Sequence, residues 1–220
     1  MNITSDEMVK NTFYITYAFL MTTATITFIE AMRTKDMNIR NILNLETCIS
    51  VVAAFFYGKF VSDLEKGIDY DKINTTRYVD WAITTPIMLL VLVLAFLYNN
   101  KAGALSFSKF VLILIMNYAM LGFGYVGEIG MLNKTIANGL GFVSFSAMYY
   151  YIYRHFIRGY KNFDNKLLFA LFVFLWALYG VFYFMEETKR NVGYNILDLF
   201  SKCFVGIFFW AYFTKVFKLP

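Results

Sequence analysis

Proline, cysteine and histidine are scarce in this sequence, with two, two and one copies among 220 residues. So few prolines favour long, unbroken helices, because proline interrupts the helical hydrogen-bond ladder. Cys48 and Cys203 fall inside apolar runs, so we expect small packing residues rather than a disulfide or a metal ligand. His155 stands in a predicted basic loop, where solvation is favoured over ligation. We therefore expect no bound metal ion.

Charged residues are also scarce, at 16% of the chain, whereas hydrophobic residues reach 59% and aromatic residues 20%. A mean hydropathy of +0.54 excludes an ordinary soluble domain and indicates an integral membrane protein that crosses the bilayer several times. The formal charge of +5 would suit a nucleic-acid partner, but the basic residues are spread over short loops. We expect membrane lipids, and no nucleic acid, as partners.

Seven apolar runs are each near the ~20 residues that cross a hydrocarbon core. They lie at about 11–33, 39–60, 76–98, 105–127, 132–154, 164–186 and 192–216. Residues 1–220 are therefore predicted to form a single domain, an all-α bundle of seven membrane-spanning helices. The one long connection, residues 58–76, is acidic and contains turn residues, which favours a surface loop.

The loops on one side of these runs are the more basic, with only Asp36 and Asp164 as nearby acids. Their basic residues are Arg33, Lys35, Arg40, Lys101, Lys109, Arg154, Arg158, Lys161, Lys166, Lys215 and Lys218. Because basic loops are retained in the cytoplasm, the N-terminus is predicted to be extracellular and the C-terminus cytoplasmic.

An amine and an acid interrupt the last apolar run. Lys202 lies near its middle, roughly 15 Å from the nearer end at 1.5 Å per residue, which is too far for its side chain to reach the headgroups. Asp198 precedes it by four residues and so shares its helix face. Two explanations remain: an ion pair between helices, or an amine that forms a Schiff base with a carbonyl ligand.

The third run places a cation, an acid and a hydroxyl on one helix face, because Arg77, Asp80 and Thr84 are spaced i, i+3 and i+7. Pro86 follows and can kink the helix. Other runs contain Glu46, Asn117, Trp176, Tyr179 and Tyr183. These aromatic residues suit ordinary helix packing or, beside a buried lysine, a box around an elongated apolar ligand.

The stretch from Arg77 to Pro86, with Asp198 and Lys202 in the last of seven runs, closely resembles the microbial (type 1) rhodopsins over essentially the whole chain. The resemblance implies all-trans-retinal bound to Lys202 as a protonated Schiff base and photoisomerised to the 13-cis form. It also implies Asp80 and Asp198 as counterions, with Arg77 below them. The other positions matched to the retinal site are Trp81, Thr84, Thr85, Met88, Asn117, Trp176, Tyr179 and Tyr183.

Particular roles follow from the same resemblance. Trp81, Trp176 and Tyr179 would sandwich the polyene, whereas Thr85 and Asn117 would link the third and fourth spans. Met88 falls where the family tunes colour, and an apolar residue there is similar to the green-absorbing members.

The chain departs from the proton-pumping members at two places. Val91 stands where a carboxylic acid reprotonates the Schiff base in those pumps, and Arg190 replaces one of their external acids. Instead, polar residues occur along the spans, which suits a hydrated cation path. The proposed path residues are Glu46, Asn195, Glu30 and Thr12. This combination resembles the viral rhodopsins, some of which are light-gated cation channels.

Three functions are therefore considered, none of them enzymatic. A light-gated channel for monovalent cations is favoured, with Glu46 and Asn195 forming a polar constriction between the second and seventh spans. A light-driven outward proton pump is the alternative, with Glu46 replacing the lost proton donor. A photosensor would need a transducer, of which the sequence gives no sign, and a homo-oligomer is compatible with the sequence. Glu46 would otherwise hydrogen-bond a neighbouring helix, and the threonines of the first span would bond to their own helix carbonyls.

Overall fold

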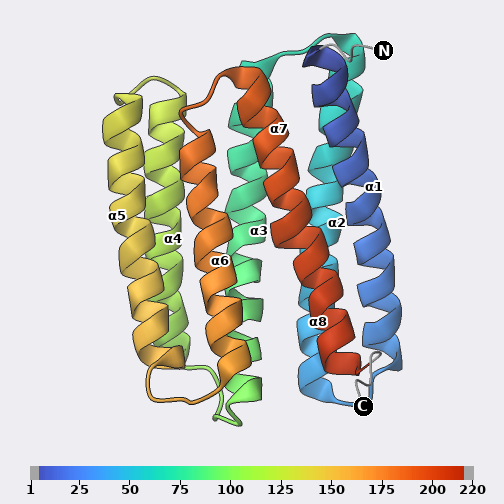
Figure 1. Ribbon diagram of the computed structural model, residues 1–220, viewed down its shortest axis with the longest axis vertical. Helices are drawn as coiled ribbons and strands as arrows, with labels where there is room; N and C mark the ends of the chain where they lie inside the picture. Colours follow the sequence, from blue (N-terminus) through green and yellow to red (C-terminus); the bar gives the residue numbers. More distant parts are fainter. Residues whose placement is uncertain (1–4, 216–220) are drawn as a thin grey trace. The chain divides into compact units, whose positions relative to one another are not determined.

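The computed structural model describes residues 5–215, so Val216 and Lys218 lie outside it. Within that range the chain is helical and forms seven columns joined by short loops (Figure 1). The elements are α1 (Ser5–Arg33), α2 (Met37–Lys66), α3 (Tyr70–Asn99), α4 (Phe107–Glu128), α5 (Lys134–Ile152), η1 (Tyr153–Ile157), α6 (Phe163–Phe182), α7 (Glu187–Asp198), η2 (Leu199–Phe204) and α8 (Val205–Thr214). Because α7, η2 and α8 are consecutive, they form the seventh column, and the predicted seven-helix fold is confirmed.

Six of the columns are long and apolar enough to cross a membrane. The other column, α5, is 19 residues long. Its mean hydropathy is lowered by Asn138, two serines and a run of three tyrosines from Tyr149 to Tyr151. These spans confirm an integral, multi-pass membrane protein. The orientation of the N-terminus stays a prediction.

The prediction of a long loop at residues 58–76 is wrong. Helix α2 continues to Lys66 and α3 begins at Tyr70, so only residues 67–69 connect them. Polar side chains stabilise these helix ends outside the apolar stretch, because Lys72 pairs with Asp63 at 2.9 Å and the Tyr14 hydroxyl donates to Glu65 at 3.2 Å. Apolar length alone therefore underestimates these helices.

The chain divides into two compact units, which we describe separately. Unit 1 comprises residues 1–73 and 185–220, and unit 2 comprises residues 74–184. The prediction of one domain over residues 1–220 stays a prediction.

Unit 1 contains α1, α2 and the seventh column, which lie side by side in Figure 1. Helix α1 contacts α2, α7 and α8, and α2 contacts η2 and α8. Aromatic rings fill one end of this core, since the Phe13 ring lies 5.6 Å from both Tyr57 and Phe60. The loop into α2 is fixed by Asp36, whose carboxylate accepts hydrogen bonds from the backbone N–H groups of Asn38 and Ile39. These contacts fix α2 against the column that carries Lys202.

Unit 2 contains most of α3 together with α4, α5 and α6. Side-chain amides connect the end of α3 to the start of α6: Asn99 donates to Asn165 at 2.8 Å, and Asn165 donates to Asn100 at 3.0 Å. Pro86 lies within α3, which continues through it as one helix. The prediction for Cys48 is wrong, because this residue is exposed rather than packed, whereas Cys203 is buried.

Two helices contain π-helical turns that the sequence did not predict. One, η1, continues α5 and includes His155, whose ring nitrogen Nδ1 lies 3.0 Å from the Tyr151 carbonyl oxygen. His155 is therefore part of a helix and not of a loop. The other, η2, contains Lys202. Such turns are often found at functional sites because they interrupt the regular hydrogen-bond ladder.

Candidate functional site in unit 1 and the family of the chain

Lys202 is held in the π-helical turn of the seventh column and is nearly fully buried, with 2% of its surface exposed. Its Nζ lies 3.3 Å from Oδ1 of Asp198, which is also buried. The predicted sharing of one helix face by these two residues is confirmed. A buried ammonium without a nearby negative charge would be costly, so this carboxylate stabilises a positive charge at the amine.

A chain of hydrogen bonds extends from Asp198 toward the N-terminal end of α7. The Tyr57 hydroxyl lies 2.8 Å from Oδ2 of Asp198 and 3.1 Å from Oδ1 of Asn195. The Asn195 amide donates to Thr12 Oγ1 at 2.9 Å, and Thr16 Oγ1 donates to the Asn195 carbonyl at 3.1 Å. Three helices of unit 1 thus fix the carboxylate beside Lys202.

Tyr57 was missed by the sequence analysis. It stands in an aromatic-rich part of α2, where a tyrosine is usually a packing residue. A signal was nevertheless present, because Tyr57 follows Glu46 by eleven residues, which is close to three helical turns. The two residues therefore share the face of α2 that is directed at the seventh column.

Glu46 lies on the opposite side of Lys202, toward the C-terminal end of the column. It is buried, with 2% of its surface exposed, and together with Thr23 of α1 it borders the space that a side chain at Gly206 of α8 would fill. A Cβ built on Gly206 would lie 3.0 Å from Glu46 Oε2 and 2.8 Å from the Thr23 methyl carbon Cγ2. Among the described residues, no hydrogen bond joins this buried carboxyl to another helix.

The polar constriction expected between Glu46 and Asn195 is not formed. Asn195 bonds to Tyr57 and Thr12, whereas Glu46 faces Gly206, eleven residues further along the column. At 1.5 Å per residue this is roughly 16 Å. The reason is the antiparallel course of α2 and the seventh column, which places Tyr57, and not Glu46, at the level of Asn195.

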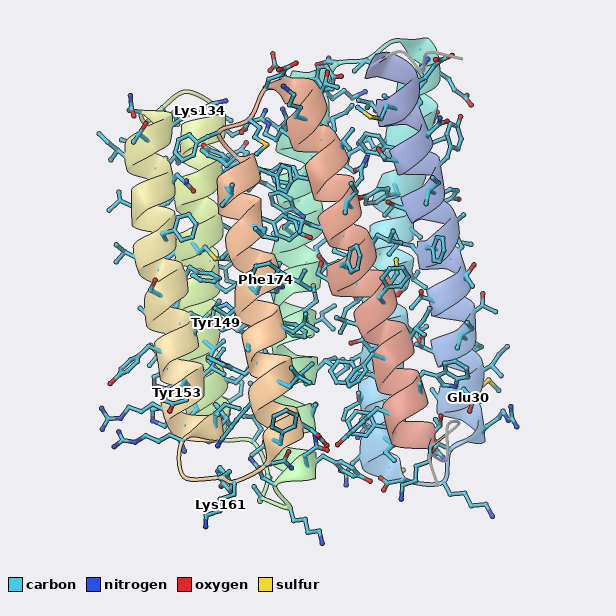
Figure 2. All side chains as sticks on the ribbon, viewed as in Figure 1. Glu30, Lys134, Tyr149, Tyr153, Lys161 and Phe174 are labelled. Carbon is cyan, nitrogen blue, oxygen red and sulfur yellow. The ribbon has the colours of Figure 1, made fainter. Side chains whose placement is uncertain are left out.

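Glu30 and three of the threonines of α1 are explained by local interactions. Glu30 lies near the C-terminal end of α1 and pairs with Arg33 at 3.0 Å (Figure 2). Thr22, Thr25 and Thr27 each donate to a carbonyl four residues earlier in their own helix. The interpretation of these three as helix-bonded residues is confirmed.

The expected residues of α3 belong to unit 2. Arg77 and Asp80 are buried, and Thr84 donates to the Asp80 carbonyl at 2.9 Å. Between helices, the Asn117 amide of α4 donates to Thr85 Oγ1 at 2.9 Å. This bond is the connection between the third and fourth spans that the resemblance implies.

Aromatic rings form a cluster in the same unit, in which the Trp81 ring lies 5.5 Å from Tyr179 and edge-on to it. Trp176 lies 6.0 Å from Tyr149, which projects from α5 toward α6 (Figure 2). Tyr183 directly follows α6 and donates to the Gly124 carbonyl at 3.1 Å. Met88 is buried. The sequence analysis missed Tyr149, which lies in a run of three tyrosines with no distinguishing signal.

The residues of unit 1 fit a carbonyl cofactor attached through an imine. The amine of Lys202 is buried in an apolar column, where it cannot exchange freely with water, and Asp198 is positioned to balance a cationic nitrogen. Tyr57 holds that carboxylate in place. The donor set therefore suits the retinal that the sequence resemblance implies.

Comparisons with known proteins identify the family of the chain. Residues 8–216 match the family described as bacteriorhodopsin-like protein. The green-light absorbing proteorhodopsin of Gamma-proteobacterium EBAC31A08 is 27% identical over 164 residues, which cover 66% of this chain and 63% of that protein. The blue-light absorbing proteorhodopsin of Gamma-proteobacterium Hot 75m4 is 24% identical over 161 residues, again covering 63% of its length.

Solved structures agree as well. The crystal structure of viral rhodopsin OLPVRII is 59% identical, with 96% of this chain and 99% of that chain covered and a TM-score of 0.91. Acetabularia rhodopsin I, from its 1.52 Å crystal structure, is 17% identical, with 96% of each chain covered and a TM-score of 0.79, and it supports the fold alone. The chain therefore belongs to the bacteriorhodopsin-like family, the microbial rhodopsins, and among these it is most like the viral members.

Proposed function

We propose that this chain is a light-driven proton transporter with all-trans-retinal attached to Lys202. Retinal supplies light absorption and isomerisation when it is bound. The residues of the chain hold its attachment point, balance the charge there and move protons to and from it. The observation that carries the proposal is the position of Glu46, a buried carboxyl about one helical turn beyond Lys202.

Charge balance at Lys202 is assigned to two carboxylates. Asp198 is 3.3 Å from the amine and is oriented by Tyr57. Asp80 is proposed as the second counterion, with Arg77 as its cationic partner, on the strength of the sequence match. The aromatic residues Trp81, Trp176 and Tyr179 are proposed to pack against the polyene. Thr84, Thr85, Met88, Asn117 and Tyr183 complete the proposed retinal site.

Proton delivery is assigned to Glu46. Gly206 follows Lys202 by four residues, a rise of roughly 6 Å, so the carboxyl that contacts Gly206 is near the amine but not bonded to it. An ionised carboxylate buried without a cation would be costly, so Glu46 is expected to hold a proton. This placement suits a donor that replaces the acid missing at Val91.

A light-gated cation channel is the second candidate, and the hydrogen-bonded series Thr12, Asn195, Tyr57 and Asp198 favours it. Such a series supplies oxygen ligands along part of a cation path. It ranks second because the Glu46 side offers a carboxyl expected to be neutral, and a neutral group attracts cations weakly. The expected constriction that supported the channel is also not formed.

Photocurrents in voltage-clamped cells supplied with retinal separate the two functions. A pump gives an outward current that persists across voltages, and Glu46→Gln should reduce it while Glu30→Gln, at the α1 end, leaves it intact. A current that reverses with the cation gradient in the unmodified protein would contradict the pump and favour the channel.

A further inference from the structure

Gly206 lies inside the seventh column, in the first turn of α8 directly after η2, where the chain stays helical on both sides. Glycine costs about 1 kcal/mol relative to alanine in a helix interior, so its presence there calls for a packing reason. The structure provides one: the space that a side chain at 206 would fill is taken by Glu46 of α2 and Thr23 of α1.

The contacts at this position leave no room for a larger residue unless a neighbour shifts. A Cβ at 206 would approach the Thr23 methyl carbon to 2.8 Å and Glu46 Oε2 to 3.0 Å, and both neighbours are buried. Real carbon contacts lie near 3.5–4.0 Å, so at least one group would have to move. The threonine methyl is fixed by a β-branched side chain in a helix, whereas the glutamate has more rotamers. Thr23 and Glu46 would both have to shift, so the carboxyl would lose its present position against the column.

We propose that Gly206 is a positioning residue, which with Thr23 forms a socket that holds the Glu46 carboxyl against the seventh column one turn beyond Lys202. The inference deepens the proposed function, on which it rests. Without a side chain at 206, the carboxyl reaches the column on the face that also carries Lys202, since residues four apart share a helix face. With alanine there, the carboxyl would be pushed away from the amine it serves.

Infrared spectroscopy tests the position of the carboxyl independently of transport. The infrared bands of the Glu46 carboxyl are identified as those that disappear in Glu46→Gln. Spectra are recorded from membranes with and without added retinal. Gly206→Ala should shift or broaden these bands in both samples. Adding Thr23→Ser, which removes the nearest methyl group and keeps the hydroxyl, should return the bands toward those of Thr23→Ser alone.

The kinetic readout is the decay of the deprotonated photointermediate after a flash. Gly206→Ala should slow it by up to about ten-fold, because misplacing a reacting group by 1 Å can cost about a hundred-fold and the 3.0 Å contact with Glu46 Oε2 requires a smaller shift. Added azide, a diffusible proton donor, should restore the rate. The matched control is Gly58→Ala, since a Cβ there would meet the Tyr17 ring at an ordinary 3.5 Å and no Glu46 band should change.

Unchanged Glu46 bands and an unchanged decay in Gly206→Ala would overturn the socket. If the single variant does not accumulate in the membrane, Gly206→Ala/Thr23→Ser is compared with Thr23→Ser instead. A small residual shift of the Glu46 bands is expected there, because the contact with Oε2 remains, and identical bands would overturn the socket. Displaced bands in Gly206→Ala combined with normal transport by Glu46→Gln would leave the socket standing and contradict the proposed proton transport.

Discussion

The two sides of Lys202 within unit 1 differ in how they hold a carboxyl group. On the side of α7, Asp198 is 3.3 Å from the amine and is bonded by Tyr57, which in turn is close to Asn195. On the side of α8, Glu46 is also buried, and together with Thr23 it borders the space at Gly206. The Asp198 carboxyl is held by hydrogen bonds and by the Lys202 amine, whereas the Glu46 carboxyl is held by van der Waals packing.

This difference separates two tasks that both involve a carboxyl. A carboxylate that balances a permanent positive charge should be ionised and immobile, because movement would leave the cation unpaired. A carboxyl that delivers a proton should be neutral at rest and free of competing partners. The proposed function assigns the first task to Asp198 and the second to Glu46, and the following predictions test this assignment in order of decreasing effect.

The largest effect is expected at Lys202, on which both sides depend. Lys202→Ala should abolish visible absorption, because no other lysine in the described spans is comparably buried. Absorption spectra of the purified protein supplied with retinal measure the loss. Lys189→Ala, an exposed lysine in the same column, is the control and should keep the pigment. A visible pigment in Lys202→Ala without an added amine would refute the attachment site.

The second effect concerns the colour, through the proposed counterion Asp80. Asp80→Asn should shift absorption to longer wavelength, because the positive charge of the attached nitrogen becomes less localised when a counterion is lost. The visible band should also disappear at lower pH than in the unmodified protein, since the protonated nitrogen is less stabilised. Asp71→Asn, at the exposed start of α3, should change neither. An unchanged spectrum and titration in Asp80→Asn would leave Asp198 as the sole counterion.

The third effect separates the two sides directly. Glu46→Gln should leave the colour nearly unchanged, because a neutral carboxyl and an amide differ little in charge. It should slow decay of the deprotonated intermediate roughly ten- to a hundred-fold, within the range ascribed to general acid catalysis. Flash photolysis measures the decay, and lower pH or azide should restore it. Rapid decay without a proton source would remove Glu46 from the pathway.

Much of this site could be predicted from the sequence, for identifiable reasons. Apolar runs near 20 residues located every span, and the four-residue spacing placed Asp198 beside Lys202, because both rules are local. The sequence analysis did not predict the roles of Tyr57 and Gly206. These roles depend on how α2 is aligned along the seventh column, and local sequence patterns do not determine that alignment. The same alignment explains why the expected contact between Glu46 and Asn195 was wrong.

The π-helical turn at Lys202 was not predicted from the sequence for a related reason. Its residues, Leu199–Phe204, have the composition of the surrounding helix and include no proline or glycine. Local preference therefore predicts an uninterrupted α-helix, and tertiary packing determines the difference. The roles assigned to Asp80, Arg77 and the aromatic residues of unit 2 still depend on the sequence resemblance and stay predictions.

The smallest effect is expected at Tyr57, which fixes the Asp198 side by hydrogen bonds. Tyr57→Phe keeps the ring and its packing against Phe13 but removes the hydroxyl that lies 2.8 Å from Asp198 Oδ2. Leaving buried acceptors without a donor costs about 1–3 kcal/mol, so the pigment should bleach at a lower temperature. The absorption maximum should shift slightly, and less than in Asp80→Asn, because the charge of Asp198 remains.

Tyr14→Phe is the matched control, since its hydroxyl donates to Glu65 on the exposed surface and its loss should be nearly neutral. Thermal bleaching curves of both variants measure the difference. Decay of the deprotonated intermediate should be little changed in Tyr57→Phe, because Glu46 is on the other side of Lys202. If instead Tyr57→Phe slowed that decay as much as Glu46→Gln, the two sides would be coupled, and the division between a fixed counterion and a poised donor would not hold.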